Sequence, residues 1–164
     1  MEIWDAYHEN GTLAGCDLIR GEPVPEGLFH LVSEILVKHT DGSYLIMQRY
    51  FNKIGFPGMF EANAGGSALK GETPLDTAKR ELEEETGIKA SKLTRIVDPF
   101  IERDTLFQSF LCITDCDKDA VTLQQGETIA YKWLSKEAFI KFMDSSECIP
   151  VQKSRLTPYL KSIV

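Results

Sequence analysis

The segment that most constrains the fold is residues 73–87, because it carries the start, body and stop signals of one helix. Thr73 is a favoured N-cap residue, Pro74 suits the first helical position, and Gly87 favours a helix end. At about 100° per residue, three apolar side chains share one stripe: Leu75, Ala78 and Leu82. We expect this stripe to pack against a β-sheet built from the neighbouring segments.

The same helix carries an edge of carboxylates beside its apolar stripe. Spacings of three and four residues share a helix face, which groups Glu81, Glu84 and Glu85. Three other charged side chains point toward solvent: Asp76, Lys79 and Glu83. Like charges at these spacings repel by roughly 0.2–0.5 kcal/mol per pair, and anions near a helix C-terminus oppose the helix dipole. A solvated glutamate-rich face is one interpretation. The other is a site for Mg²⁺, which prefers carboxylate oxygens.

The remaining segments predict strands joined by turns, with two more helices. Asn10-Gly11 is a strong hairpin signal, so residues 2–20 are expected to form two short strands. Further strands are expected at 30–37, 44–49, 61–64, 94–103, 106–114 and 130–134. Helices are expected from the Ser135 cap to about Met143 and, as a short helix, after Pro150. This order indicates an α+β fold: an α/β/α sandwich around a mixed sheet, with an N-terminal β-hairpin.

Charge and composition narrow the functional classes. The 164-residue chain has 43% hydrophobic residues and a net charge of -7, typical of an ordinary globular protein. An acidic chain repels the backbone of nucleic acids, so we expect no nucleic acid polymer as partner. A small phosphorylated substrate remains open, because a bound cation can invert the local field.

Cysteine usage and segment boundaries complete the general expectations. The four cysteines form no CxxC pair and accompany no histidine cluster: Cys16, Cys112, Cys116 and Cys148. We expect reduced thiols in a cytoplasmic protein. The segment MEIWDAYHEN shows no signal-peptide pattern, and no membrane span is visible. Without repeats or a linker, we expect one domain over 1–164: a hairpin extension (1–27), a core (28–145) and a tail (146–164).

From Gly66 the chain runs GSALKGETPLDTAKRELEEETGI. This pattern resembles the Nudix box: Gly, five residues, Glu, seven residues, Arg-Glu, an apolar residue, any residue, Glu-Glu, any residue, Gly and an apolar residue. Every fixed position matches: Gly66, Glu72, Arg80, Glu81, Leu82, Glu84, Glu85, Gly87 and Ile88. The box spans residues 66–88, and the strands around it extend the resemblance over about residues 28–145.

The resemblance implies a metal site. It assigns the divalent metal, Mg²⁺ or Mn²⁺ as a substitute, to Glu81, Glu84, Glu85 and a backbone carbonyl at Gly65. Glycine there would let the backbone approach a ligand closely. Arg80 is expected to orient the carboxylates, with an ordinary surface ion pair as the alternative. Glu72 is expected to stabilise the loop through hydrogen bonds and to support the metal ligands.

The resemblance also implies the reaction, which is hydrolysis of a diphosphate linkage in a small molecule by metal-activated attack of water on phosphorus. Glu81 and Glu127 are both candidates for the base that takes the proton of the water, although Glu127 is equally an ordinary loop residue. Arg49 and Lys53 are expected to bind substrate phosphate, with solvated positions as the alternative. The chain is therefore expected to be a MutT-like pyrophosphohydrolase.

Segments outside the box are similar to the isopentenyl diphosphate isomerase-like branch, notably WDAYHENG, GEPVPEGLFHLV and FPGMFE. His30 matches a histidine of that branch, although it also suits a half-buried strand position. The catalytic cysteine of true isomerases falls at Gly65, and their metal-binding histidine of the box loop falls at Ser67. We therefore expect an isomerase-like scaffold with hydrolase chemistry.

Two alternatives stay open: an isomerase of isopentenyl diphosphate, and a non-catalytic Nudix module that only binds ligands. The substrate is not specified by the sequence. It would depend on loops 50–60 and 115–128 and on aromatic side chains that could stack on a base: Tyr50, Phe51, Phe56, Phe60 and Phe107. A homodimer through the N-terminal strands is a further open expectation.

Overall fold

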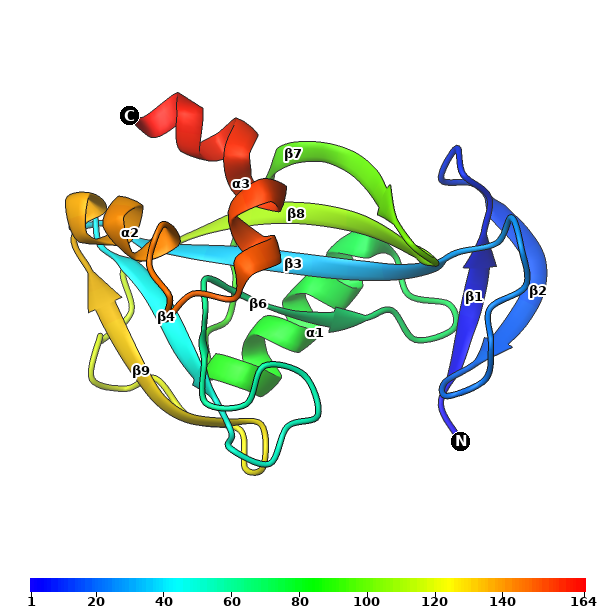
Figure 1. Cartoon of the computed structure of the whole chain (residues 1–164), viewed down its shortest axis with the longest axis horizontal. Helices are drawn as coiled ribbons and strands as arrows, with labels where there is room; N and C mark the ends of the chain where they lie inside the picture. Colours follow the sequence, from blue (N-terminus) through cyan, green and yellow to red (C-terminus); the bar gives the residue numbers. More distant parts are fainter.

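The computed structural model describes all residues, 1–164, and centres on a mixed β-sheet (Figure 1). The strands of this sheet are β3 (His30–His39), β4 (Tyr44–Arg49), β5 (Phe60–Glu61), β6 (Asn63–Ser67), β7 (Leu93–Glu102), β8 (Thr105–Thr114) and β9 (Thr128–Leu134). β3 pairs in parallel with β8 over its whole length, and β7 runs antiparallel to β8. β3, β8 and β7 therefore form one continuous part of the sheet, against which the other elements pack.

The sheet divides beside β3. The neighbouring strand β4 is paired with β3 at one position only, Lys38 with Tyr44, and then continues with β5 and β9 as partners. Beyond that position β6 pairs with β3 instead of β4. Its register runs from Asn63 opposite Leu36 to Ser67 opposite Val32. The diverging strands create an opening between β6 and the β4–β5–β9 group.

Helices cover both faces of the sheet. α1 (Pro74–Thr86) packs on one face, where Ala78 and Leu82 join a core cluster with residues of β3, β4 and β8. α2 (Lys136–Met143) and α3 (Pro150–Ile163) cover the opposite face, and the hydroxyls of Tyr44 and Tyr159 meet there at 2.8 Å. The predicted α+β class, with a mixed sheet between helices, is confirmed.

The predicted N-terminal hairpin is also confirmed. β1 (Ile3–Tyr7) and β2 (Leu13–Ile19) form a separate two-stranded antiparallel sheet at one end of the molecule (Figure 1). Trp4 stacks on His30 with ring centroids 4.5 Å apart, and the Gly71 N–H donates to Asp5 at 2.7 Å. The hairpin is therefore joined both to β3 and to the loop that precedes α1.

Three local expectations need correction. Leu75 was expected in the buried stripe but is 44% exposed. On the helix wheel it points between the buried Leu82 and Thr86, so its exposure follows from its place in the first turn, at the end of the helix. β6 continues to Ser67, beyond the expected strand end, because β3 offers it a partner along its whole length. The third helix is 14 residues long and passes through Pro158, held by buried Leu156 and Tyr159.

No helix has both the length and the apolar character needed to cross a membrane.

Candidate active site

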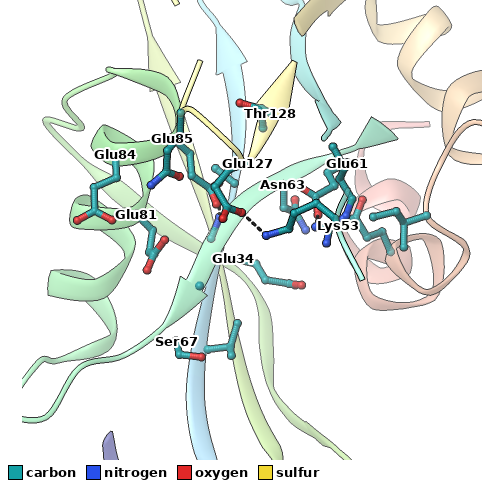
Figure 2. Close-up of a pocket in the computed structure, with 18 of the residues that line it drawn as sticks. Glu34, Lys53, Glu61, Asn63, Ser67, Glu81, Glu84, Glu85, Glu127 and Thr128 are labelled. Atoms are coloured by element: carbon teal, nitrogen blue, oxygen red, sulfur yellow. Dashed lines mark hydrogen bonds and ion pairs between the residues drawn. The ribbon is translucent and has the colours of Figure 1, made fainter. Parts of the chain in front are cut away.

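A cavity of about 490 Å³ lies at the opening of the sheet, between α1 on one side and the start of α3 on the other (Figure 2). Seven glutamates line it: Glu2, Glu34, Glu61, Glu81, Glu84, Glu85 and Glu127. Five basic side chains line it as well: Arg20, Arg49, Lys53, Arg80 and Arg155. The excess of carboxylates gives the cavity a negative character, which favours a cation as ligand.

α1 is fixed at both ends by its own sequence. The Thr73 side chain accepts from the Asp76 N–H, and the Asp76 side chain accepts in return from the Thr73 N–H, which completes a capping box. At the other end Gly87 adopts φ 75°, and its N–H bonds to the Glu83 carbonyl. The caps fix the ends of the helix, and the packing of Ala78 and Leu82 sets its rotation, so Glu81, Glu84 and Glu85 all reach the cavity.

Arg80 is the centre of a hydrogen-bond network beside the metal-ligand candidates. It donates to both oxygens of Glu72 at 2.6 and 2.9 Å, to Glu81 at 2.6 Å, to Glu84 at 3.3 Å and to the Ser67 carbonyl at 3.0 Å. These bonds fix the direction of two box carboxylates and tie α1 to the end of β6. Arg80 is only 24% exposed, unlike a simple surface ion pair.

Glu72 holds the loop between β6 and α1. Besides Arg80, it accepts from the Leu69 N–H at 2.9 Å and from the Thr77 hydroxyl at 3.0 Å. The hydrogen bond from Arg80 lowers the pKa of Glu72, so this carboxylate stays ionised and keeps its partners.

Two glycines bring β6 close to both neighbours. A Cβ at Gly65 would overlap the Ser33 carbonyl of β3, and a Cβ at Gly66 would lie 2.6 Å from the carboxylate carbon of Glu81. The Gly65 N–H donates to Glu85 Oε2 at 3.0 Å, so this edge of β6 faces α1. Side chains at these positions would push the strand away from the carboxylates.

Burial and mutual repulsion act on the carboxylates of α1. Burial raises the pKa of Glu85 well above its usual range, and the charges of Glu61, Glu81 and Glu127 raise it further. Burial also raises the pKa of Glu81, against the hydrogen bond from Arg80. A cation in this cavity would relieve the electrostatic strain, because it stabilises the ionised form of each carboxylate.

The structure brings the other predicted site residues to the same cavity. Lys53 forms an ion pair with Glu127, the residue before β9. Arg49, at the end of β4, forms an ion pair with Glu61 of β5. The two side chains expected to bind phosphate are thus each held by a carboxylate across the cavity from α1. Glu61 was not predicted from the sequence. The only sequence feature that could have indicated it is its position four residues before Gly65.

Only some of the aromatic and histidine candidates line the cavity. Phe56 and Phe107 line the cavity, Phe60 lies in the core, and Tyr50 and Phe51 are exposed outside the lining. His30 is not among the lining residues; it lies between Trp4 and the Thr105 hydroxyl, 3.4 Å away. A role of His30 in the cavity therefore finds no support.

The donor set suits a hard divalent cation, although the carboxylates are not drawn together into a closed cage. No group of three or more His, Cys, Asp or Glu side chains stands in an arrangement that already surrounds an ion. Mg²⁺ does not require one, because it keeps several waters and needs only one or two carboxylates in addition to substrate phosphates. Glu81, Glu84 and Glu85 each use one oxygen in the bonds described above, which leaves their second oxygens for a cation.

A family profile of the NUDIX domain matches residues 29–151, which is most of the chain. The chain belongs to the Nudix family. An uncharacterized Nudix hydrolase of Listeria monocytogenes is 35% identical over 151 residues, covering 92% of this chain and 89% of that protein. A counterpart in Listeria innocua is 34% identical over the same length. Family membership supports hydrolysis of pyrophosphate bonds as the general chemistry of this Nudix chain.

Solved structures show the same fold. The crystal structure of DR0079 from Deinococcus radiodurans has a TM-score of 0.70 at 20% identity, covering 89% of this chain and 91% of that one. The MutT protein of Methanosarcina mazei has a TM-score of 0.62, also at 20% identity, covering 82% and 94%. At this identity the likeness concerns the Nudix fold alone. The isomerase-like branch is not distinguished by these comparisons.

Proposed function

We propose that this chain is a Mg²⁺-dependent Nudix hydrolase that cleaves a diphosphate linkage in a small molecule, with Mn²⁺ as a substitute metal. The observation that carries the proposal is the convergence of Glu81, Glu84, Glu85 and the Gly65 backbone on one cavity. Glu85 holds β6 through the Gly65 N–H, and Arg80 holds Glu81 and Glu84. Each of the three carboxylates is therefore held at the cavity wall by a hydrogen bond within the protein.

Different residues would bind the cation and the substrate phosphates. Glu81, Glu84, Glu85 and the Gly65 carbonyl would hold the cation. When bound, the cation neutralises diphosphate oxygens and lowers the pKa of a coordinated water. Arg49 and Lys53 would bind the phosphates once the cation neutralises the carboxylates with which they form ion pairs.

The base that accepts the proton is either Glu81 or Glu127, which face the cavity from α1 and from the start of β9. Replacing the base by glutamine removes general base catalysis, worth typically about 10²–10⁴-fold in rate. We expect Glu127→Gln to lower kcat by this amount if Glu127 is the base. The variant that removes the base should also lose the fall of kcat at acidic pH, and loss of that fall in Glu81→Gln alone would assign the role to Glu81.

The experiment that tests the function is a panel of diphosphate compounds with Mg²⁺ or Mn²⁺, scored by product release. The double variant Glu84→Gln/Glu85→Gln should lose at least about 10²-fold in rate, since metal ligation supplies the main charge stabilisation. Glu83→Gln, on the exposed side of the same helix, is the matched control and should keep its rate. Full activity of the double variant would contradict the proposal.

The open alternatives give different outcomes in the same panel. An isomerase would convert isopentenyl diphosphate and leave the other diphosphates intact. The site does not favour that chemistry, because Gly65 stands at the position of the isomerase cysteine. A non-catalytic module would bind a diphosphate without turnover. Each result would overturn the hydrolase proposal.

A further inference from the structure

The geometry points to Glu61 as an additional metal-binding carboxylate, which with Glu85 and Glu127 holds a divalent cation on the strand side of the cavity. This inference rests on the proposed metal-dependent hydrolysis. It adds a ligand that lies outside the Nudix box.

The three carboxylates come from separate elements and line the same cavity. Glu61 belongs to β5, Glu127 precedes β9, and Glu85 lies on α1. In Figure 2 the α1 glutamates lie on one side of the cavity, Glu61 and Lys53 lie on the other, and Glu127 lies between them in this view.

Each of the three has one oxygen engaged and one oxygen without a hydrogen-bond partner in the protein. Oε1 of Glu61 accepts from Arg49, Oε2 of Glu127 accepts from Lys53, and Oε2 of Glu85 accepts from the Gly65 N–H. The second oxygens are thus available as ligands without loss of these bonds. Carboxylate oxygens are ligands that both Mg²⁺ and Mn²⁺ prefer.

Two buried polar side chains in the same cavity wall give an independent indication of a ligand. Asn63 and Thr128 are only 5% and 8% exposed, and both line the cavity. Neither the amide of Asn63 nor the hydroxyl of Thr128 has a hydrogen-bond partner. An unmade bond to a buried polar group costs about 1–3 kcal/mol, so native proteins usually supply water or an ion. Waters carried by a cation beside Glu61 would supply these partners.

The charges around Glu61 also favour a cation there. The side chain of Glu61 is only 18% exposed and pairs with Arg49. Lys53 pairs with Glu127, and the hydrogen bond to Glu85 comes from the Gly65 N–H rather than from a basic side chain, so the three carboxylates together keep an excess of negative charge. A divalent cation shared with Glu127 would complete the compensation and leave Arg49 and Lys53 free to turn toward substrate phosphates.

The test is a Mn²⁺ titration of the full chain, with free Mn²⁺ followed by its electron paramagnetic resonance signal. We expect Glu61→Gln to bind one Mn²⁺ fewer per chain, or to show a Kd for Mn²⁺ raised at least about tenfold. The matched control Glu83→Gln, an exposed glutamate of α1, should bind Mn²⁺ as the wild type does. Unchanged stoichiometry and Kd in Glu61→Gln would overturn the inference.

Arg49→Gln separates a metal ligand from a mere ion-pair partner. This variant keeps Glu61 and removes its cation, so it should bind Mn²⁺ at least as tightly as the wild type. If Glu61 served only to hold Arg49, the two variants would weaken Mn²⁺ binding equally, and the inference would be wrong. If Glu61→Gln does not fold, Arg49→Gln/Glu61→Gln replaces it, because that pair leaves no buried charge unpaired.

The outcomes also separate this inference from the proposed function. A wild-type chain that binds no Mn²⁺ and hydrolyses no diphosphate would contradict both. A wild-type chain that binds Mn²⁺ and hydrolyses a diphosphate, while Glu61→Gln binds Mn²⁺ normally, would contradict only the role of Glu61.

Discussion

Glu85 occupies an unusual place for a carboxylate, at the centre of the inward face of α1. Ala78 and Leu82 of this face are fully buried, and Glu85 shares their side of the helix. Its one hydrogen bond within the protein is from the Gly65 N–H. A side chain chosen for stability alone would be apolar here, so the position indicates that function maintains it.

This placement predicts a stabilising substitution. Because burial raises the pKa of Glu85 in the folded chain, the folded state holds the proton more tightly than the unfolded state. The resulting penalty is absent below the unfolded pKa and grows as pH rises through the folded pKa. Glu85→Gln should therefore unfold at higher urea concentration at pH 7.5 with chelator present, by about 0.5–2 kcal/mol, and should match the wild type near pH 4. Equal stability at both pH values would contradict this account.

Gly65 gives a second prediction at this scale. Gly65→Ala would overlap the Ser33 carbonyl and should lower the free energy of unfolding by about 1–3 kcal/mol or more. Gly42→Ala is the matched control, because Gly42 also has a positive φ but has no atom near its Cβ position. Gly42→Ala should lose only the strain of the left-handed conformation, roughly 1–2 kcal/mol. A loss in Gly65→Ala no larger than in Gly42→Ala, measured by urea unfolding, would show that β3 and β6 can separate at low cost.

The sequence identifies some site residues and not others for a physical reason. Glu81, Glu84 and Glu85 could be found because helix periodicity and the box spacing place them together within one segment. Glu61, Asn63 and Thr128 reach the cavity only through strand pairings far apart in the sequence. No local pattern carries that information, so these residues became visible only in three dimensions.

At the scale of elements, α1 was predictable almost completely and α3 was not. The residues that cap α1 lie within residues 73–87, and the observed range of the helix agrees with the predicted one. α3 contains Pro158, which removes a backbone donor and normally ends a helix. Its length instead depends on tertiary contacts of Leu156 and Tyr159 with the core, which a local reading does not include.

Arg155 shows how α3 is anchored. It donates to buried Glu34 of β3 at 3.0 Å and to Glu102 of β7 at 2.7 and 3.0 Å, and it lies 4.1 Å above the Phe107 ring. It therefore joins three strands to one helix. The profile match ends at residue 151, so this anchor lies beyond the matched region although it lines the cavity.

We expect Arg155→Met to destabilise the chain by about 3–5 kcal/mol in urea unfolding, because it leaves the buried carboxylate of Glu34 without its partner. Lys153→Met on the same helix is the control: its ion pair with Asp144 is exposed, so its loss should cost at most about 1 kcal/mol. Similar losses in both variants would show that the Glu34–Arg155 pair contributes no more than a surface contact.

At the scale of the whole molecule, the fold class followed from the order of elements, but the site did not. Strand patterns predicted a mixed sheet between helices, and the structure agrees. The cavity exists because β4 leaves β3 after one paired position and β6 replaces it. Such a division of a sheet depends on long-range pairing, which strand patterns do not specify. The cytoplasmic location and a homodimer through β1 and β2 stay predictions.

The most direct measurement of the central claim is the anomalous difference map of a crystal grown with Mn²⁺. The account predicts a peak bounded by the carboxylates of Glu81, Glu84 and Glu85 and by the Gly65 carbonyl. A well-ordered crystal without a peak at that position, or with Mn²⁺ bound only at the molecular surface, would contradict it.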